Sequence, residues 1–314
     1  MATTTSITTT YAGEFAGEYI SAALLSAPTI EQGGITVKPN VKYKEVIKKV
    51  ATGDLVANAT CDFTDTSSVT LTERILEPEE FQVNLELCKK DFRSDWEAIE
   101  MGFSTFDQLP PSFSDFLIAH VAEKVAQKTE QTIWNGADAT AGEFDGFIAL
   151  MTADTDVNDV TATTVDASNV IDELGKVASA VPNAVWGAED FRIYVPQNVY
   201  RAYVRALGGF GSNGLGANGI NAEGPTGHSG SRRVGNVPYD FEGVPLFVCN
   251  GLPSNRMVAA QASNLYFGTS LVADHNEVKV LDMADLDGSQ NVRVIMRYTS
   301  GVQYGIGSDV VLYS

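Results

Sequence analysis

The chain has 314 residues, of which 44% are hydrophobic, so it is long enough for two packed domains or for one domain with a large insertion. Its 21 Lys and Arg residues stand against 40 Asp and Glu residues, which gives a formal net charge of −19. This balance argues against a sequence-specific nucleic-acid reader, because such proteins neutralise phosphates with basic residues. It fits an acidic surface in solution, or a chain that encloses a polyanion without adhering to it.

Targeting signals and cysteine motifs are absent from the sequence. No stretch approaches the roughly 20 apolar residues of a membrane span, and the first residues have neither the basic nor the apolar region of a secretory signal. Cys61, Cys88 and Cys249 are widely separated and form no C-x-x-C motif, which fits folding in a reducing cytoplasm.

The first part of the chain is predicted to be an arm followed by β structure. Residues 1–35 are rich in Thr and carry few apolar anchors, too few to fold alone. The apolar residues of 42–50 fit a helix face as well as a strand. VTLTERIL (69–76) places Val69, Leu71 and Ile75 on one face of a strand, which Glu73 interrupts. FQVNLELC (81–88) alternates, with these residues directed inward: Phe81, Val83, Leu85 and Leu87.

A long helix is predicted over 112–134. Its apolar residues recur at the three-and-four spacing of one buried face, and they are Phe113, Phe116, Leu117, Val121, Val125 and Ile133. Pro111 with Ser112 or Ser114 marks its start, and Gly136 marks its end because Gly tolerates a left-handed conformation. At about 1.5 Å per residue the helix spans roughly 30 Å or more. Such a helix after a β ribbon indicates the spine of a plate rather than an enzyme pocket.

The following segment predicts a compact α/β domain. The stretch 152–168 is a surface loop or short edge strands, and Ser168 is expected to cap a helix that ends before Pro182. The buried face of that helix comprises Val170, Ile171, Leu174, Val177, Ala178 and Val181. A buried strand at 191–195 precedes a helix opened by Pro196. Further strands are expected around 244–249, 257–261, 265–267, 278–283, 291–299 and 310–313.

A glycine-rich stretch, 208–227, contains two matches to G-x-G-x-x-G, starting at Gly209 and at Gly214. That motif binds a dinucleotide only where a strand feeds the loop and a helix leaves it. Here a helix precedes the loop, more loop follows, and no Walker lysine is present. A long loop that is mobile or is ordered by assembly is therefore favoured over a nucleotide site.

Catalytic and metal motifs are not found. His120, His228 and His275 are scattered and belong to no metalloprotease or triad signature. Asp282, Asp285 and Asp287-Gly288 resemble half of a calcium loop, but an acidic turn between two strands is the favoured interpretation. We therefore assign no catalytic residue, no cofactor and no metal site, and we expect no enzymatic activity.

Three stretches together resemble the major capsid proteins of tailed bacteriophages, which have the Hong Kong 97 fold. The stretch 71–96 is similar to the family's extended loop returning into the peripheral domain, and 112–134 is similar to its spine helix. The stretches 264–283 and 291–305 are similar to its C-terminal passage, where a Phe-Gly step, here Phe267-Gly268, leads to long strands.

This resemblance implies an α+β fold with an N-terminal arm (1–35) and an extended β-hairpin loop (36–77), and it favours a strand over 42–50. It implies a peripheral domain (78–145 and 263–303) with the spine helix. It also implies an axial α/β domain (146–262 and 304–314), with the 208–227 loop near the five- or six-fold centre.

The function that the resemblance implies is self-assembly through hexameric and pentameric capsomers into an icosahedral shell around double-stranded DNA. The implied location is the virion, assembled in the host cytoplasm, with scaffold, portal and decoration proteins as further partners and no membrane. Some relatives form Lys–Asn crosslinks, but no motif assigns such a pair to Lys48 or Lys49. The alternatives are an encapsulin-type compartment shell and a nucleotide-binding enzyme that uses 208–227.

Overall fold

A computed structural model of the protein describes residues 28–52, 68–88, 111–208, 240–270, 278–284 and 288–314, with positions 56, 58 and 61. The chain forms two compact units. The first takes in 80–128 and 271–299, and the second takes in 27–79, 129–270 and 300–314.

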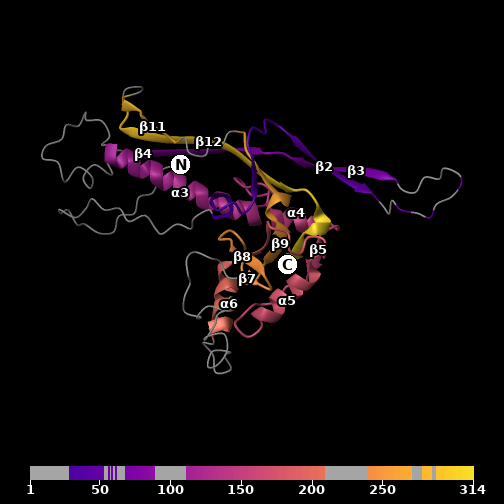
Figure 1. Ribbon diagram of the computed structural model, residues 1–314. Helices are drawn as coiled ribbons and strands as arrows, with labels where there is room; N and C mark the ends of the chain where they lie inside the picture. Colours follow the sequence, from indigo (N-terminus) through magenta and orange to yellow (C-terminus); the bar gives the residue numbers. More distant parts are fainter. Residues whose placement is uncertain are drawn as a thin grey trace. The chain divides into compact units, whose positions relative to one another are not determined.

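The first unit is a sheet with a helix packed on one face. Strand β12 (Asn291–Tyr304) pairs with β4 (Glu79–Cys88) and antiparallel with β11 (Lys279–Asp282). Helix α3 (Pro111–Asn135) lies alongside β4 and β12 (Figure 1). Its buried side chains meet those of β12 in one apolar cluster: Leu117, Val121, Val125, Val294, Met296 and Tyr298. The helix predicted over 112–134 is thus confirmed to within one residue at each end.

The alternation predicted for β4 is confirmed for three of its four inward residues. Phe81, Val83 and Leu87 pack against the cluster beneath α3. The prediction is wrong for Leu85, which is 43% exposed. The side chains of Phe113 and Phe116 lie outside the described residues.

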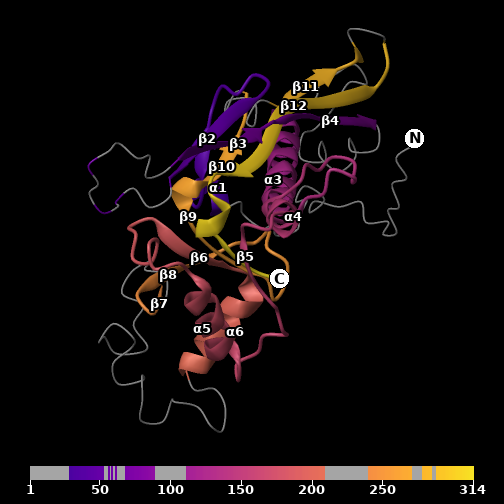
Figure 2. The ribbon, with the colours of Figure 1, turned by 90° about the vertical axis from the view of Figure 1, so that its right-hand side faces the viewer.

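The second unit contains a six-stranded sheet in the order β5 (Asn158–Val160), β13 (Val311–Tyr313), β9 (Met257–Gln261), β6 (Phe191–Val195), β8 (Val244–Val248) and β7 (Asp240–Phe241). The β5–β13 and β6–β8 pairs are parallel, and the others are antiparallel. Helices α5 (Val170–Ala180) and α6 (Gln197–Gly208) lie together against the sheet (Figure 2). The predicted α/β arrangement is confirmed.

Inward-facing residues of the strands explain the packing of this sheet. Alternate residues of the central strands, such as Ile193 and Ala259, meet α5 and α6 in one buried core. Tyr194 points to the opposite face, where its ring lies 5.1 Å from that of Trp134 at the end of α3. A short helix, α4 (Phe147–Ala153), adds Phe147 beside the same Trp134 ring at 5.4 Å.

Two expectations about helix ends are corrected. Ser168 does not cap α5: the N-cap residue is Asn169, which makes no side-chain capping bond, and Asp166 Oδ1 accepts from the backbone N–H of Ser168 at 2.7 Å and of Asn169 at 3.2 Å in the preceding turn. Ile171, expected in the buried face, is 39% exposed. Gly136 is not left-handed. Glycine is required there because a Cβ would lie 2.2 Å from the carbonyl oxygen of Phe144.

The remaining elements of the second unit include the hairpin. Strand β1 (Thr36–Lys38) runs parallel to β10 (Leu265–Gly268), which pairs antiparallel with the C-terminal part of β12. Strands β2 (Glu45–Thr52) and β3 (Val69–Leu76) form a separate antiparallel hairpin, which confirms the strand favoured over 42–50. Short helical turns complete the unit: α1 (Pro28–Glu31), η2 (Ala262–Asn264) and η4 (Gly307–Asp309).

Residues 28–35, predicted as the end of the arm, pack inside the second unit, where Thr29 and Ile35 are buried. Several predicted features lie outside the described residues: 1–27 of the arm, 209–227 of the glycine stretch, His228, His275, Asp285 and Asp287.

Candidate functional site: the β2–β3 hairpin and its root

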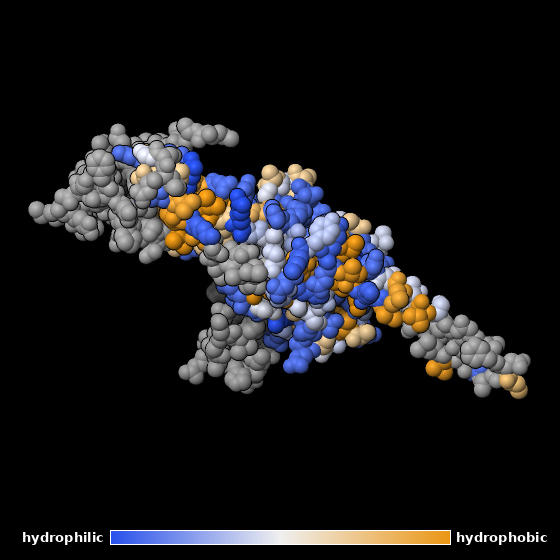
Figure 3. Space-filling model, turned by 90° about the horizontal axis from the view of Figure 1, so that it is seen from above, coloured by the Kyte–Doolittle hydropathy of each residue, from blue (hydrophilic) through white to orange (hydrophobic). Residues whose placement is uncertain are grey.

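One face of the hairpin exposes five apolar side chains, which are interrupted by the opposed residues Lys48 and Glu73. The register pairs Val46 with Ile75, Lys48 with Glu73, and Val50 with Leu71, and Val69 lies two residues from Leu71 on the same strand, so these side chains share a face. The five apolar members are 43–69% exposed: Val46, Val50, Val69, Leu71 and Ile75. Figure 3 shows apolar side chains gathered along this hairpin. We call these five residues the apolar stripe. A two-stranded ribbon is marginal alone, and an exposed apolar face with open strand edges marks an interaction surface.

The return of the hairpin into the body sits over two glycines. Leu76, at the end of β3, is fully buried. Gly268 of β10 and Gly301 of β12 lie opposite each other. A Cβ on Gly268 would lie 2.9 Å from Leu76 Cδ2, and one on Gly301 would lie 2.9 Å from the carbonyl oxygen of Glu77. The Phe267-Gly268 step noted in the sequence therefore leaves room for the root of the hairpin.

Polar contacts also fasten this root. Lys44 Nζ lies 2.7 Å from Glu77 Oε2, and Lys38 forms an ion pair with Glu45. Gln303 Nε2 donates to the carbonyl oxygen of Ile75 at 3.0 Å. These contacts join the two ends of the hairpin to each other, to β1 and to β12, so they hold its base in place.

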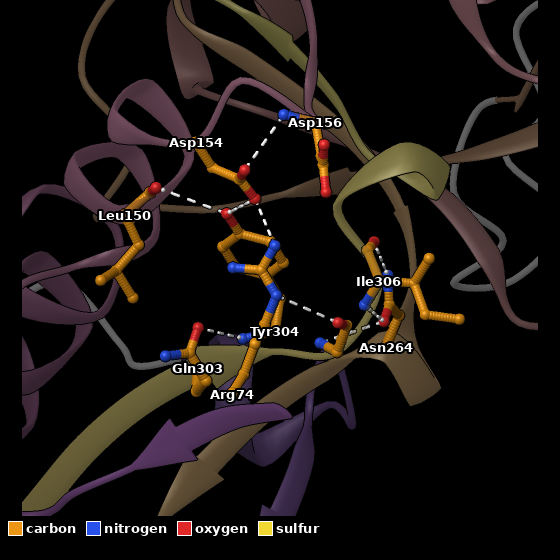
Figure 4. A network of polar contacts seen from close by, with 9 residues as sticks. Arg74, Leu150, Asp154, Asp156, Asn264, Gln303, Tyr304 and Ile306 are labelled. Atoms are coloured by element: carbon orange, nitrogen blue, oxygen red, sulfur yellow. Dashed lines mark hydrogen bonds and ion pairs between the residues drawn. The ribbon is translucent and has the colours of Figure 1, made fainter. Parts of the chain in front are cut away.

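A denser network surrounds Arg74 (Figure 4). Its guanidinium forms an ion pair with Asp154, its Nε donates to the carbonyl oxygen of Gly305 at 3.2 Å, and it lies over the ring of Tyr304 at 4.3 Å. The Tyr304 hydroxyl donates to Asp154 Oδ2 at 2.7 Å, and the Asp156 N–H donates to Asp154 Oδ1 at 3.0 Å.

Protonation states in this network favour the contacts seen. Burial acts to raise the pKa of Asp154, but hydrogen bonds from Tyr304, the Asp156 N–H and Arg74 outweigh burial and lower that pKa below its usual value. Burial, together with the bond to Asp154, raises the pKa of the Tyr304 hydroxyl, so it remains a donor. Asp154 therefore stays ionised opposite Arg74 at neutral pH.

Truncating the buried anchor should loosen the root. Leu76→Ala removes a fully buried side chain from its place against Gly268 and is expected to cost about 2–5 kcal/mol in unfolding free energy. Leu71→Ala, on the exposed stripe, should change that free energy by no more than about 0.5 kcal/mol. Urea unfolding of both variants checks this difference, and equal effects would contradict the assignment of Leu76 as the anchor.

A second polar cluster fixes residues 28–31 within the second unit. Thr29 Oγ1 donates to Glu130 Oε1 at 2.5 Å, and Trp134 Nε1 donates to Thr29 Oγ1 at 2.9 Å. Cys249 Sγ lies 3.7 Å from the same hydroxyl. Burial raises the pKa of the Cys249 thiol, which makes it a poor nucleophile. The cluster therefore anchors the chain where it enters the fold, and its chemistry is not that of an activated nucleophile.

Glu130 in this cluster is only 1% exposed, and burial raises its pKa despite the hydrogen bonds from Thr29 and the Gly251 N–H. A carboxyl whose folded pKa lies above its unfolded value binds the proton more tightly when folded, so its contribution to stability falls as pH rises between those two values. The stability advantage of the natural protein over Glu130→Gln should therefore shrink as pH rises above the unfolded Glu pKa of about 4.3. Denaturant unfolding across pH checks the sign; an advantage that grows with pH would contradict it.

The structure does not bring the other singled-out residues into a site. His120 is half-buried on α3. Cys61 is exposed, Cys88 is half-buried, and no two of the cysteines form a disulfide. Within the described ranges no group of three or more His, Cys, Asp or Glu residues could hold a metal ion, and no helix is long and apolar enough to cross a membrane.

Sequence reasoning did not find the Arg74 network. One signal was available, because Arg74 shares the face of β3 on which Leu76 lies and so stands at an inward position of an alternating strand. A charged residue there requires a partner. Its partner, Asp154, lies 80 residues further on and carries no local signal.

Comparison with solved structures finds the same fold in several phage and capsid proteins. No family model and no curated protein matches this chain. The capsid of a native GTA particle matches with a TM-score of 0.62 and 14% identity, over 95% of this chain and 93% of that one. The chain has a capsid fold. The capsid of Myoviridae phage XM1 matches with a TM-score of 0.59 and 13% identity, over 95% and 94% of the two chains. A structure of Mycobacterium phage Che8 matches with 0.56 and 12%, over 98% of each.

These matches cover nearly the whole of this chain and nearly the whole of each matched chain. The shared fold therefore includes the hairpin, α3 and the six-stranded sheet. They confirm the mixed α+β, Hong Kong 97-type fold expected from the sequence.

Proposed function

We propose that this protein is the major capsid protein of a tailed bacteriophage and assembles into an icosahedral shell around double-stranded DNA. The observation that carries the proposal is the apolar stripe on a hairpin firmly anchored at its root, within a capsid fold. A second copy of the chain is the natural cover for such a stripe, since many identical copies surround each subunit in a closed shell. The role is structural, without catalysis.

The parts of the chain take the following roles in this proposal. Of the hairpin loop, 36–77, the ribbon beyond its root lies across a neighbour. Of the arm, 1–35, the residues before Thr29 are ordered along a neighbour, since Thr29 anchors the chain within its own subunit. Residues 78–145 and 263–303 form the peripheral domain. Residues 146–262 and 304–314 form the axial domain, with 208–227 around the centre of pentamers and hexamers.

The setting follows from the same proposal. The shell belongs to the virion and is assembled in the host cytoplasm, with scaffold, portal and decoration proteins as partners. The net charge of −19 suits a wall that encloses DNA without holding it by sequence.

Sedimentation velocity of the purified full chain tests the proposal. Pentamers, hexamers or closed particles are expected, with nuclease-protected DNA in particles taken from infected cells. A stable monomer at high concentration, with and without a candidate scaffold, would contradict it.

Particles that hold an enzyme instead of DNA would favour the encapsulin alternative. Saturable ATP or NAD binding, abolished by Gly214→Ala with Gly216→Ala and Gly219→Ala, would favour the nucleotide-binding enzyme.

A further inference from the structure

Among the described hairpin residues, Arg74 is the one furthest from the root that forms a hydrogen bond or an ion pair with the body of the second unit. Moving from the root toward the tip, Leu76, Ile75 and Arg74 each contact residues outside the hairpin. Beyond them, in the described parts of the ribbon, no hydrogen bond or ion pair joins 48–52 or 69–73 to other elements. Within its described residues the ribbon therefore extends from Arg74 as a lever, with no further polar contact to the described body.

The length of this lever makes its direction sensitive to the root. Val69 lies five positions along the strand from Arg74, which is roughly 17 Å at about 3.3 Å per residue. A rotation of about 10° at Arg74 would move Val69 by roughly 3 Å on that scale. Such a shift exceeds what close packing of an apolar contact tolerates.

The surroundings of Arg74 fix the guanidinium in position and orientation. The Asp154 carboxylate, the Gly305 carbonyl and the Tyr304 ring hold it from different directions. Asp154 is itself held by the Tyr304 hydroxyl and by the Asp156 N–H. A planar, delocalised cation is needed, because lysine reproduces neither the fork of donors nor the stacking.

The backbone around the pair is adapted to this arrangement. A Cβ on Gly307 would lie 2.7 Å from Asp154 Oδ2 and 3.2 Å from Arg74 Nη2. Glycine at 307 therefore leaves the space that the ion pair occupies. The segment Tyr304–Gly307 thus contributes the Tyr304 ring and the Gly305 carbonyl to the contacts of Arg74, and Gly307 leaves space beside them.

We infer that Arg74 is a positioning residue that fixes the direction of the hairpin before a second copy of the chain covers the apolar stripe. This inference rests on the proposed function. Leu76 is fully buried at the root, whereas Arg74 is half-buried and its contacts fix the direction of the ribbon. A hairpin already aimed at its neighbour loses less conformational entropy on binding, so the network favours correct closure of the shell.

The test measures hairpin direction and assembly separately. Spin labels at Thr72→Cys on the hairpin and Ser179→Cys on α5, with Cys61→Ser and Cys88→Ser, report the distance distribution in dilute, unassembled subunits. Electron microscopy then counts closed shells formed by the unlabelled variants. The variants are Arg74→Lys, and Tyr304→Phe, which removes only the hydroxyl that holds Asp154. The matched control is Arg293→Lys, which alters an exposed Arg–Glu pair of the first unit, 3.1 Å between Arg293 Nε and Glu86 Oε2.

Arg74→Lys should broaden the distance distribution and lower the yield of closed shells about tenfold, the factor that a 1.4 kcal/mol loss gives. Tyr304→Phe should do the same to a lesser degree, and Arg293→Lys should do neither. An unchanged distribution in both variants would overturn the inference, as would a broadened one with normal shells. If the natural protein forms no shells, the proposed function fails, while the distance measurement still judges whether Arg74 sets the hairpin direction.

Discussion

Val50→Asp combined with Leu71→Asp should abolish shell assembly while the subunit stays folded. The two residues face each other across the hairpin and are 62% and 69% exposed, so the subunit gains little from them. In the shell, the same pair would place two carboxylates in an apolar contact, where an unpaired charge costs several kcal/mol. Because each subunit makes this contact, the penalty recurs around every capsomer, and the yield of closed particles should fall below detection.

Size-exclusion chromatography and thermal unfolding check this prediction together. Thr72→Asp is the control, since Thr72 is an exposed residue on the opposite face of the same strand. We expect it to assemble as the natural protein does. Normal shells from the double variant would show that the apolar stripe is not covered by a neighbour.

Trp134→Ala should be the most destabilising single truncation in the second unit, at about 3–5 kcal/mol. The Trp134 side chain is fully buried, and its ring lies within 5.4 Å of the rings of Phe147 and Tyr194. Its Nε1 also donates to Thr29, so truncation leaves a buried hydroxyl with one fewer partner. A large effect is expected because the end of α3 is a central part of this core.

Denaturant unfolding followed by circular dichroism measures the cost. Trp134→Phe keeps an aromatic ring but loses the N–H donor, so it should cost less than the alanine variant. A cost below about 1 kcal/mol for Trp134→Ala would contradict the placement of Trp134 in the core, since that range is typical of surface changes.

The parts of the fold that follow from local pattern were predictable. The apolar spacing of 112–134 gave α3 to within a residue at each end, and the run at 191–195 gave β6. The positions of the strands along the chain were also predictable, because the alternation of apolar residues and the turn residues between strands are patterns of only a few positions. The resemblance to capsid proteins supplied the choice that pattern left open at 42–50.

The remaining features depend on contacts that local pattern does not encode. Ser168 is a good capping residue by type, yet the helix begins at Val170 after Asn169, and the N–H of Ser168 donates to Asp166 in the preceding turn. Gly136 looked like a left-handed helix end, yet its role is to let Phe144 approach. The partners Thr29 and Glu130 lie 101 residues apart, so the sequence alone gives no sign of their contact.

Electron microscopy of the purified full-length protein tests the central claim most directly. The account predicts closed icosahedral shells or ring-shaped capsomers, and a reconstruction in which the hairpin of each subunit lies with its apolar stripe against a neighbouring copy. Dispersed single subunits at high protein concentration, or shells in which the apolar stripe faces solvent, would contradict it.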